Sequence, residues 1–140
     1  MAFTTRTLRD TVVNAAGAGG TVTVKVDIED DTTANNAILD ASALSGHADG
    51  AKLDISRLWW ALTQGSADDD TGHIELQEVS SGTDIVQIRL AGTGHYDGSA
   101  GLIAGTAANT TVTSGDHEIT TFGTSGFVII EFKKDSAWTA

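Results

Sequence analysis

Hydrophobic and polar residues alternate along much of this chain, which is the pattern of β-strands with one buried face. The clearest case is the segment 21–29, in which every second residue is apolar: Val22, Val24, Val26 and Ile28. The same alternation recurs at 73–79, 84–90 and 127–133. In the last of these segments Phe127 and Ile129 make the second face apolar as well, which predicts a strand that is covered on both sides.

The segment 53–63 changes phase within the strand pattern. Its first apolar residues, Leu53 and Ile55, have one parity, and Leu58, Trp60 and Leu62 have the other. One extra residue near positions 56–57, a β-bulge, would bring both sets to the same face. Weaker strand signals lie at 7–13, 101–104 and 116–122.

These segments predict an all-β fold, an antiparallel β-sandwich or jelly-roll-like architecture of about eight short strands. A length of 140 residues favours one domain over 1–140. The segment 30–52 is predicted to be a long loop excursion, and such loops are often functional. Helix signals are weak, and the best of them lies within this segment, at 34–44, where Asp40 is placed to cap a short turn.

The charge of the chain excludes several partners. Eight Lys and Arg stand against nineteen Asp and Glu, which gives a net charge of −11. So acidic a protein is a poor ligand for nucleic acid or for anionic membrane lipid. There is no cysteine, which excludes disulfides and thiolate metal sites. No apolar run approaches membrane-span length, and residues 1–6 lack the apolar core of a signal peptide, so we expect a soluble product made in a cytoplasm.

An acidic cluster offers the best metal candidates. Asp27, Glu29 and Asp31 alternate along the end of a strand, so they would share a face, and oxygen ligands suit calcium. The spacing is not that of an EF-hand loop. A solvated acidic turn accounts for the same residues and is the reading we favour, so we expect no metal and no cofactor.

Aromatic residues are the candidates for an interaction surface. Trp59 and Trp60 are neighbours on one strand, so their side chains point to opposite faces. We expect Trp60 in the core, and Trp59 either covered or exposed for a sugar or protein partner. Together with Tyr96 and Trp138, Trp59 would form an aromatic platform for a carbohydrate.

Catalytic motifs are weak. His95, Asp97 and Ser99 lie close together in a glycine-rich segment, but no nucleophile elbow accompanies them. The carboxylates of Glu118 and Glu131 lie on predicted strands, and a glycosidase pair is not recognisable from their spacing. We therefore expect that the protein is not an enzyme.

Four segments, taken in order, resemble small β-rich virion structural proteins of tailed phages, particularly marine phages. They are the Trp-bearing strand 55–60, the strand 85–97 that ends in a Gly-Thr-Gly-His-Tyr-Asp turn, the Ser-Gly-Asp step 114–116 and the Lys-ended strand 127–134. The resemblance covers residues 53–135. It implies a capsid decoration (cement) protein on the outside of the shell, over the joints between capsomers.

The same resemblance implies the partners. They are the major capsid protein or other virion proteins, together with further copies of this chain as a homo-oligomer, for which a trimer is expected. Residues 1–9, with Arg6 and Arg9, would be an N-terminal arm reaching an adjacent subunit, or else a frayed terminus. Two alternatives remain open: a tail or neck (tube) component of the virion, and a carbohydrate-binding β-sandwich module.

Overall fold

The computed structural model describes residues 2–11, 20–46, 53–67, 71–79, 84–103 and 116–134. These residues form nine strands and one short 3₁₀ helix. The elements are β1 (Ala2–Asp10), β2 (Thr21–Asp31), β3 (Asn36–Leu39), η1 (Ala41–Ala43), β4 (Leu53–Gln64), β5 (His73–Glu78), β6 (Ile85–Ala91), β7 (Thr93–Tyr96), β8 (His117–Phe122) and β9 (Thr124–Lys134).

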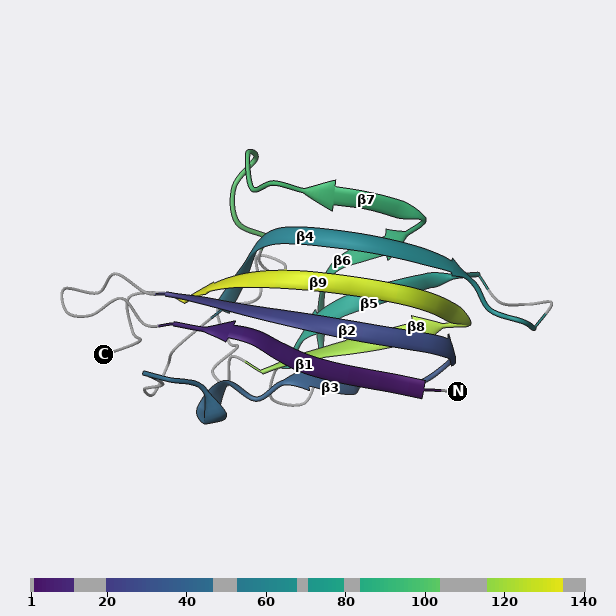
Figure 1. The fold of residues 1–140 in the computed structure, drawn as a ribbon, viewed down its shortest axis with the longest axis horizontal. Coiled ribbons are helices and arrows are strands. Elements are labelled where there is room, and N and C mark those ends of the chain that lie inside the picture. The colour runs from purple at the N-terminus through teal and green to yellow at the C-terminus, as the bar shows by residue number, and fades with distance from the viewer. Residues whose placement is uncertain are drawn as a thin grey trace.

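The strands form two antiparallel sheets that pack face to face (Figure 1). One sheet has five strands in the order β1-β2-β9-β4-β7, and the other has four in the order β3-β8-β5-β6. Without the edge strand β1, each sheet has four strands, and the chain crosses repeatedly from one sheet to the other. This is the strand order of a jelly roll, so the predicted all-β sandwich is confirmed.

The alternating apolar side chains meet between the two sheets. Val22, Val24 and Val26 are 0% exposed, as their alternation predicts. The other strands contribute in the same way, and the buried core also includes Ile28, Ile38, Leu39, Ala41, Leu53, Ile55, Leu58, Leu62, Ile74, Leu76, Leu90, Ile119, Val128, Ile130 and Phe132.

The predicted bulge in β4 is confirmed. Ile55 pairs with Phe132 and Arg57 with Glu131, so Ser56 is the extra residue. The bulge returns Leu58 to the core face and turns Trp59 outward. The predicted cap is also present, because the Asp40 carboxylate accepts a hydrogen bond from the Ser42 N–H at 3.0 Å.

Several element boundaries differ from the sequence prediction. The segment expected to be a long loop contains β3, which pairs with β8. The glycine-rich segment after β6 contains β7, which pairs with β4. Between positions 101 and 103 only Ile103 makes a bridge, to Ile55. The strand expected at 7–13 begins earlier, so Ala2–Asp10 form an edge strand of this chain's own sheet where an arm was expected.

Glycine is required at two places where the sheets turn or approach closely. At Gly92, with φ 64°, the chain leaves one sheet at the end of β6 and enters the other as β7. Gly126 has φ 133°, and a Cβ there would lie 2.0 Å from the carbonyl oxygen of Ala61. Any side chain at 126 would push β9 away from β4.

An ion pair joins the ends of β1 and β9 at one end of the five-stranded sheet. The Lys134 side chain at the end of β9 is 1% exposed, and its Nζ donates to Asp10 Oδ1 at 2.6 Å and to the Ser45 carbonyl at 2.8 Å. The Ser45 N–H donates to Asp10 Oδ2 at 2.9 Å. Burial opposes ionisation of Asp10, but the bonds from Lys134 and Ser45 outweigh it and hold its pKa below the usual range. The Asp10 carboxylate is therefore charged at neutral pH, and its bond to Lys134 ties β1 to β9.

Replacement of Asp10 by alanine is expected to lower the free energy of unfolding by about 3–5 kcal/mol, because it leaves the Lys134 ammonium buried without its carboxylate. The measurement is urea unfolding at neutral pH. The matched control is Asp27→Ala, which removes an exposed carboxylate 3.4 Å from Lys25 and should cost less than about 1 kcal/mol. Equal losses in the two variants would contradict the structural role of the buried pair.

Candidate docking face on the five-stranded sheet

The outward side of the five-stranded sheet brings together residues far apart in the sequence. Strand register places Arg6 opposite Lys25, Lys25 opposite Ile129, Ile129 opposite Trp59 and Trp59 opposite His95. This row crosses all five strands. We call the outward-facing side chains of β1, β2, β9, β4 and β7 the docking face.

The centre of the docking face is apolar. In the row next to Trp59 and Ile129, Phe127 of β9 lies opposite Ala61 of β4. We call these four residues the apolar strip. Trp59 is 37% exposed and the other three are half-buried. The side of β9 that the sequence predicts to be covered is therefore only partly covered within the described part of the chain.

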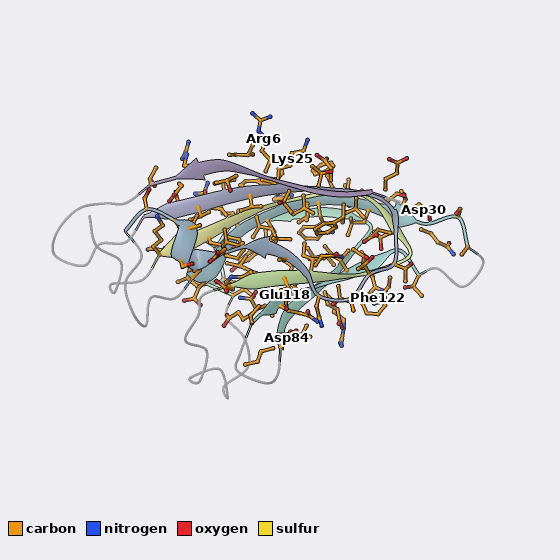
Figure 2. All side chains as sticks on the ribbon, turned by 90° about the horizontal axis from the view of Figure 1, so that it is seen from below. Arg6, Lys25, Asp30, Asp84, Glu118 and Phe122 are labelled. Atoms are coloured by element: carbon orange, nitrogen blue, oxygen red, sulfur yellow. The ribbon has the colours of Figure 1, made fainter. Side chains whose placement is uncertain are left out.

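The charges around the apolar strip differ from those of the whole chain. Five of the eight Lys and Arg lie on the docking face: Arg6, Arg9, Lys25, Arg57 and Lys133. The carboxylates facing the same way in these strands are those of Asp27, Glu29, Asp54 and Glu131. The docking face is thus close to neutral on a chain of charge −11. Figure 2 shows Arg6 and Lys25 on this side, and Glu118 and Asp84 on the opposite side of the molecule.

A shallow hollow of about 470 Å³ opens at one end of the docking face. Its polar wall includes Arg57, Glu131 and Lys133, and its other wall is formed by the segment from Asp97 to Leu102. Within it the Ser56 hydroxyl donates to Glu131 Oε1 at 2.9 Å. Arg57 Nε lies 3.7 Å from the same oxygen. Since Trp59 is two residues from Arg57 on the same face, the hollow has an aromatic side chain beside it.

The structure brings three of the five predicted interaction residues onto one face. Arg6, Arg9 and Trp59 all point outward from the docking face. Tyr96 does not join them: it lies opposite Leu58 on the inward side of the sheet, packs against the core, and donates its hydroxyl to the Gly101 carbonyl. Trp138 lies outside the described residues.

The three metal candidates do not share a face, which corrects the expectation from their spacing. Asp27 and Glu29 are exposed, whereas Asp31 is 2% exposed and accepts hydrogen bonds from Thr121 Oγ1 at 2.7 Å and Thr33 Oγ1 at 2.9 Å. The cause is Asp30, whose φ of 46° shifts the register at the end of β2. Among the residues that the structure describes, no cluster of His, Asp and Glu is suited to hold a metal ion.

Asp30 and Asp97 have structural roles in turns. The Ser66 hydroxyl and N–H donate to the Asp30 carboxylate at 2.6 and 3.0 Å, and these bonds lower the pKa of Asp30. The Ser99 N–H donates to Asp97 Oδ1 at 2.9 Å and lowers the pKa of Asp97. Asp97 therefore closes a turn with Ser99, and His95 lies in the row of Trp59.

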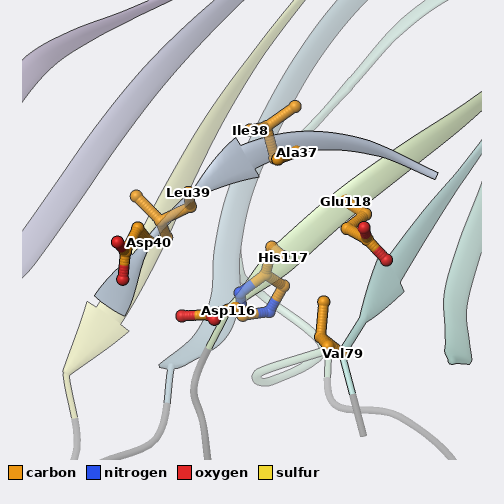
Figure 3. Close-up of a pocket in the computed structure, with 8 residues that line it drawn as sticks. All are labelled: Ala37, Ile38, Leu39, Asp40, Val79, Asp116, His117 and Glu118. Atoms are coloured by element: carbon orange, nitrogen blue, oxygen red, sulfur yellow. The ribbon is translucent and has the colours of Figure 1, made fainter. Parts of the chain in front are cut away.

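A second carboxylate group lies on the four-stranded sheet. Burial of Glu118, a hydrogen bond that its protonated carboxyl donates to Asp84, and the charges of Asp84 and Asp116 all raise the pKa of Glu118. A hollow of about 480 Å³ beside β3 and the start of β8 is lined by eight residues, including Asp116, His117 and Glu118 (Figure 3). Glu118 and Glu131 belong to opposite outer faces of the sandwich, so these two do not form a glycosidase pair.

Comparison of the chain with models of known families, with curated proteins and with solved structures found no match. No helix among the described residues has the length and apolarity needed to cross a membrane.

The two adjacent tryptophans test the assignment of faces. Trp60 packs against the core and its Nε1 donates to the Ala91 carbonyl at 3.0 Å, so Trp60→Ala is expected to cost about 2–5 kcal/mol. Trp59→Ala removes an outward side chain and should cost less than about 1 kcal/mol. Urea unfolding of both variants measures the difference. A larger loss at 59 than at 60 would contradict the phase of β4.

Proposed function

We propose that this protein is a virion structural protein of a tailed phage, a capsid decoration protein that binds the outside of the shell and stabilises contacts between capsomers. Its partner is then the major capsid protein. The observation that carries the proposal is the docking face: a near-neutral sheet surface with a central apolar strip, on a jelly roll that is otherwise acidic. The resemblance of residues 53–135 to small virion proteins supports the same reading.

The apolar strip has the composition of an interface core. Aromatic side chains are enriched at the centres of protein–protein interfaces, and charged side chains are moved to the rim. On the docking face Trp59 and Phe127 are central, and Arg6, Arg9 and Lys133 lie toward the edges. Since the strip lies on paired strands, a partner surface would meet side chains that are already held in place, which lowers the entropic cost of binding.

The charge distribution fits a protein that covers a lattice. Acidic side chains elsewhere repel other free copies in solution and keep the outer surface soluble. Because the docking face is near neutral, it can approach a shell without that repulsion. Many such contacts, repeated over one particle, give avidity even where each contact is weak.

Binding to particles tests the proposal directly. Heads of the parent phage assembled without this protein are mixed with the purified chain, pelleted, and imaged by electron cryomicroscopy. The wild type should bind the outside of the heads at regular positions. Trp59→Asp is expected to reduce binding at least about tenfold, because a buried unpaired carboxylate costs more than 1.4 kcal/mol at an interface.

The matched control is Phe122→Asp. Phe122 is a half-buried aromatic residue on the opposite sheet, and its ring stacks on that of His73 with centroids 4.2 Å apart. It should bind heads as the wild type does. Binding to tails or necks in place of heads would instead support a tail or neck (tube) component that uses the same docking face. Absence of binding to any part of the particle would overturn the virion proposal.

A second candidate function is carbohydrate binding, which the exposed Trp59 beside the polar hollow favours. Aromatic faces stack on sugar rings, and the Arg57–Glu131 pair offers hydrogen-bond donors and acceptors for hydroxyl groups.

Isothermal titration with neutral oligosaccharides tests the carbohydrate candidate. A saturable heat that is lost in Trp59→Ala and kept in Phe122→Ala would support sugar binding. If Trp59→Ala leaves the heat unchanged, the sugar binds at a site that does not include Trp59. If none of the sugars tested gives any heat of binding, the carbohydrate candidate is wrong.

A further inference from the structure

The open edge of β1 differs from the other three sheet edges. The edge strands are β1 and β7 in one sheet and β3 and β6 in the other. β3 and β7 have four residues each and β6 has seven, whereas β1 has nine. β1 pairs only with β2, so the backbone N–H and C=O groups along its other edge have no partner within the described part of the chain.

This edge has little protection against pairing. Natural edge strands are usually short, carry proline or inward-pointing charges, or contain bulges. The chain has no proline. β1 has one irregularity, between Thr7 and Arg9, so that its register with β2 is regular from Ala2 to Thr7. In that regular stretch the only charged residue is Arg6, which points outward.

The inward side of β1 is also uncovered. Thr5 and Thr7 lie opposite Val26 and Val24, which are fully buried, yet both threonines are exposed. The sheet therefore overhangs its partner sheet by one strand. Another strand added beside β1 would place its own inward side chains next to these threonines and next to Phe3, which already packs against the core.

Charge opposes a second copy of this chain less at this edge than at the others. An acidic residue stands beside each of the other edges: Asp84, which accepts the hydrogen bond from Glu118, precedes β6, Asp97 follows β7, and Asp40 follows β3. The acid of β1 is Asp10, and it is paired with Lys134. β1 is thus the edge at which two chains of charge −11 meet with the least repulsion.

We propose that β1 strands of two copies pair antiparallel across a twofold axis, which joins the two five-stranded sheets into one of ten strands. In an antiparallel pair, opposite residues must point to the same face. A register with Thr5 of one copy opposite Thr5 of the other meets this condition. The same register places Phe3 of each copy opposite Thr7 of the other, and Thr4 opposite Arg6. This register brings threonines and an apolar side chain together and keeps the two Arg6 side chains apart.

The inference is independent of the proposed function, because it concerns the isolated protein. It also differs from the trimer that the resemblance implies. A twofold pair leaves both docking faces on the same side of the extended sheet, so that both copies would be able to bind one surface together.

Sedimentation equilibrium of the full chain over a range of concentrations provides the test. The wild type should show a reversible monomer–dimer equilibrium, with more dimer at higher NaCl concentration because salt screens the repulsion between acidic chains. Thr5→Lys and Thr5→Glu should each weaken the dimer roughly tenfold or more, since each places like charges opposite each other. Both substitutions are at an exposed position, and thermal unfolding checks that each variant is folded.

A mixture of the two variants separates this register from a general effect of charge. Thr5→Lys and Thr5→Glu chains should form a heterodimer when mixed, because the axis brings the two substituted residues face to face. Thr93→Lys on the edge strand β7 is the matched control and should dimerise like the wild type. The proposal would be overturned if the wild type were a monomer at all concentrations or a trimer. It would also be overturned if substitution of Thr5 left the dimer unaffected, or if the two variants did not regain dimer formation on mixing.

Discussion

Strand β9 is the element on which the rest of the structure depends, because both of its edges and both of its faces are in use. It pairs with β2 along one edge and with β4 along the other. Its inward residues Val128, Ile130 and Phe132 are at most 1% exposed and form the centre of the core. Its outward residues Phe127 and Ile129 form half of the apolar strip. The same alternation that builds the core therefore also builds the surface that we propose for docking.

The end of β9 controls the periphery of the sheet. Lys134 is buried at the point where β1 ends, and its ion pair with Asp10 is the main side-chain link between β1 and the rest of the molecule. From Thr4 to Arg9 the side chains of β1 are exposed, so backbone hydrogen bonds to β2 supply most of the attachment of this stretch. This explains how one strand can belong to the fold and still present an open edge to a partner.

The sequence predicts those strands whose burial is one-sided and whose pairing is regular. Val22 to Ile28 and Val128 to Phe132 are examples, and the phase change at Ser56 reveals the bulge because the apolar residues on each side must share one core. β3 is missed because four residues, Asn36 to Leu39, carry too little alternation. Their strand form depends on pairing with β8, some 80 residues away. β7 is missed because Gly94 within it and Gly92 and Gly98 around it favour a turn reading, although the turn from β6 into β7 is made at Gly92.

The docking face is predictable residue by residue but not as a surface. The sequence singles out Trp59 as an aromatic residue that does not share the core face of its strand, and Arg6 as one of the few cations near the N-terminus. The apolar residues Phe127 and Ile129, which alternate with the core residues of β9, indicate that the second side of this strand is also covered. What the sequence does not contain is the register that aligns five separate strands into one row. Tyr96 shows the consequence: once β7 pairs so that His95 lies opposite Trp59, the next residue must face the core.

The separation of charge on the two sheets follows from the same register. Outward positions on β2, β4 and β9 alternate with core positions, so each has to be polar or to form part of an interface. Three cations lie among them, and Arg6 and Arg9 of β1 bring the number on this face to five. On the opposite sheet, Glu118 is close enough to Asp84 and Asp116 for their charges to raise its pKa. A chain that only needed solubility would have no reason to hold its few cations around an apolar strip on one sheet. Under the proposed function, the near-neutral docking face would approach the shell and the acidic sheet would point away from it, so that the protein would coat the shell in a single orientation.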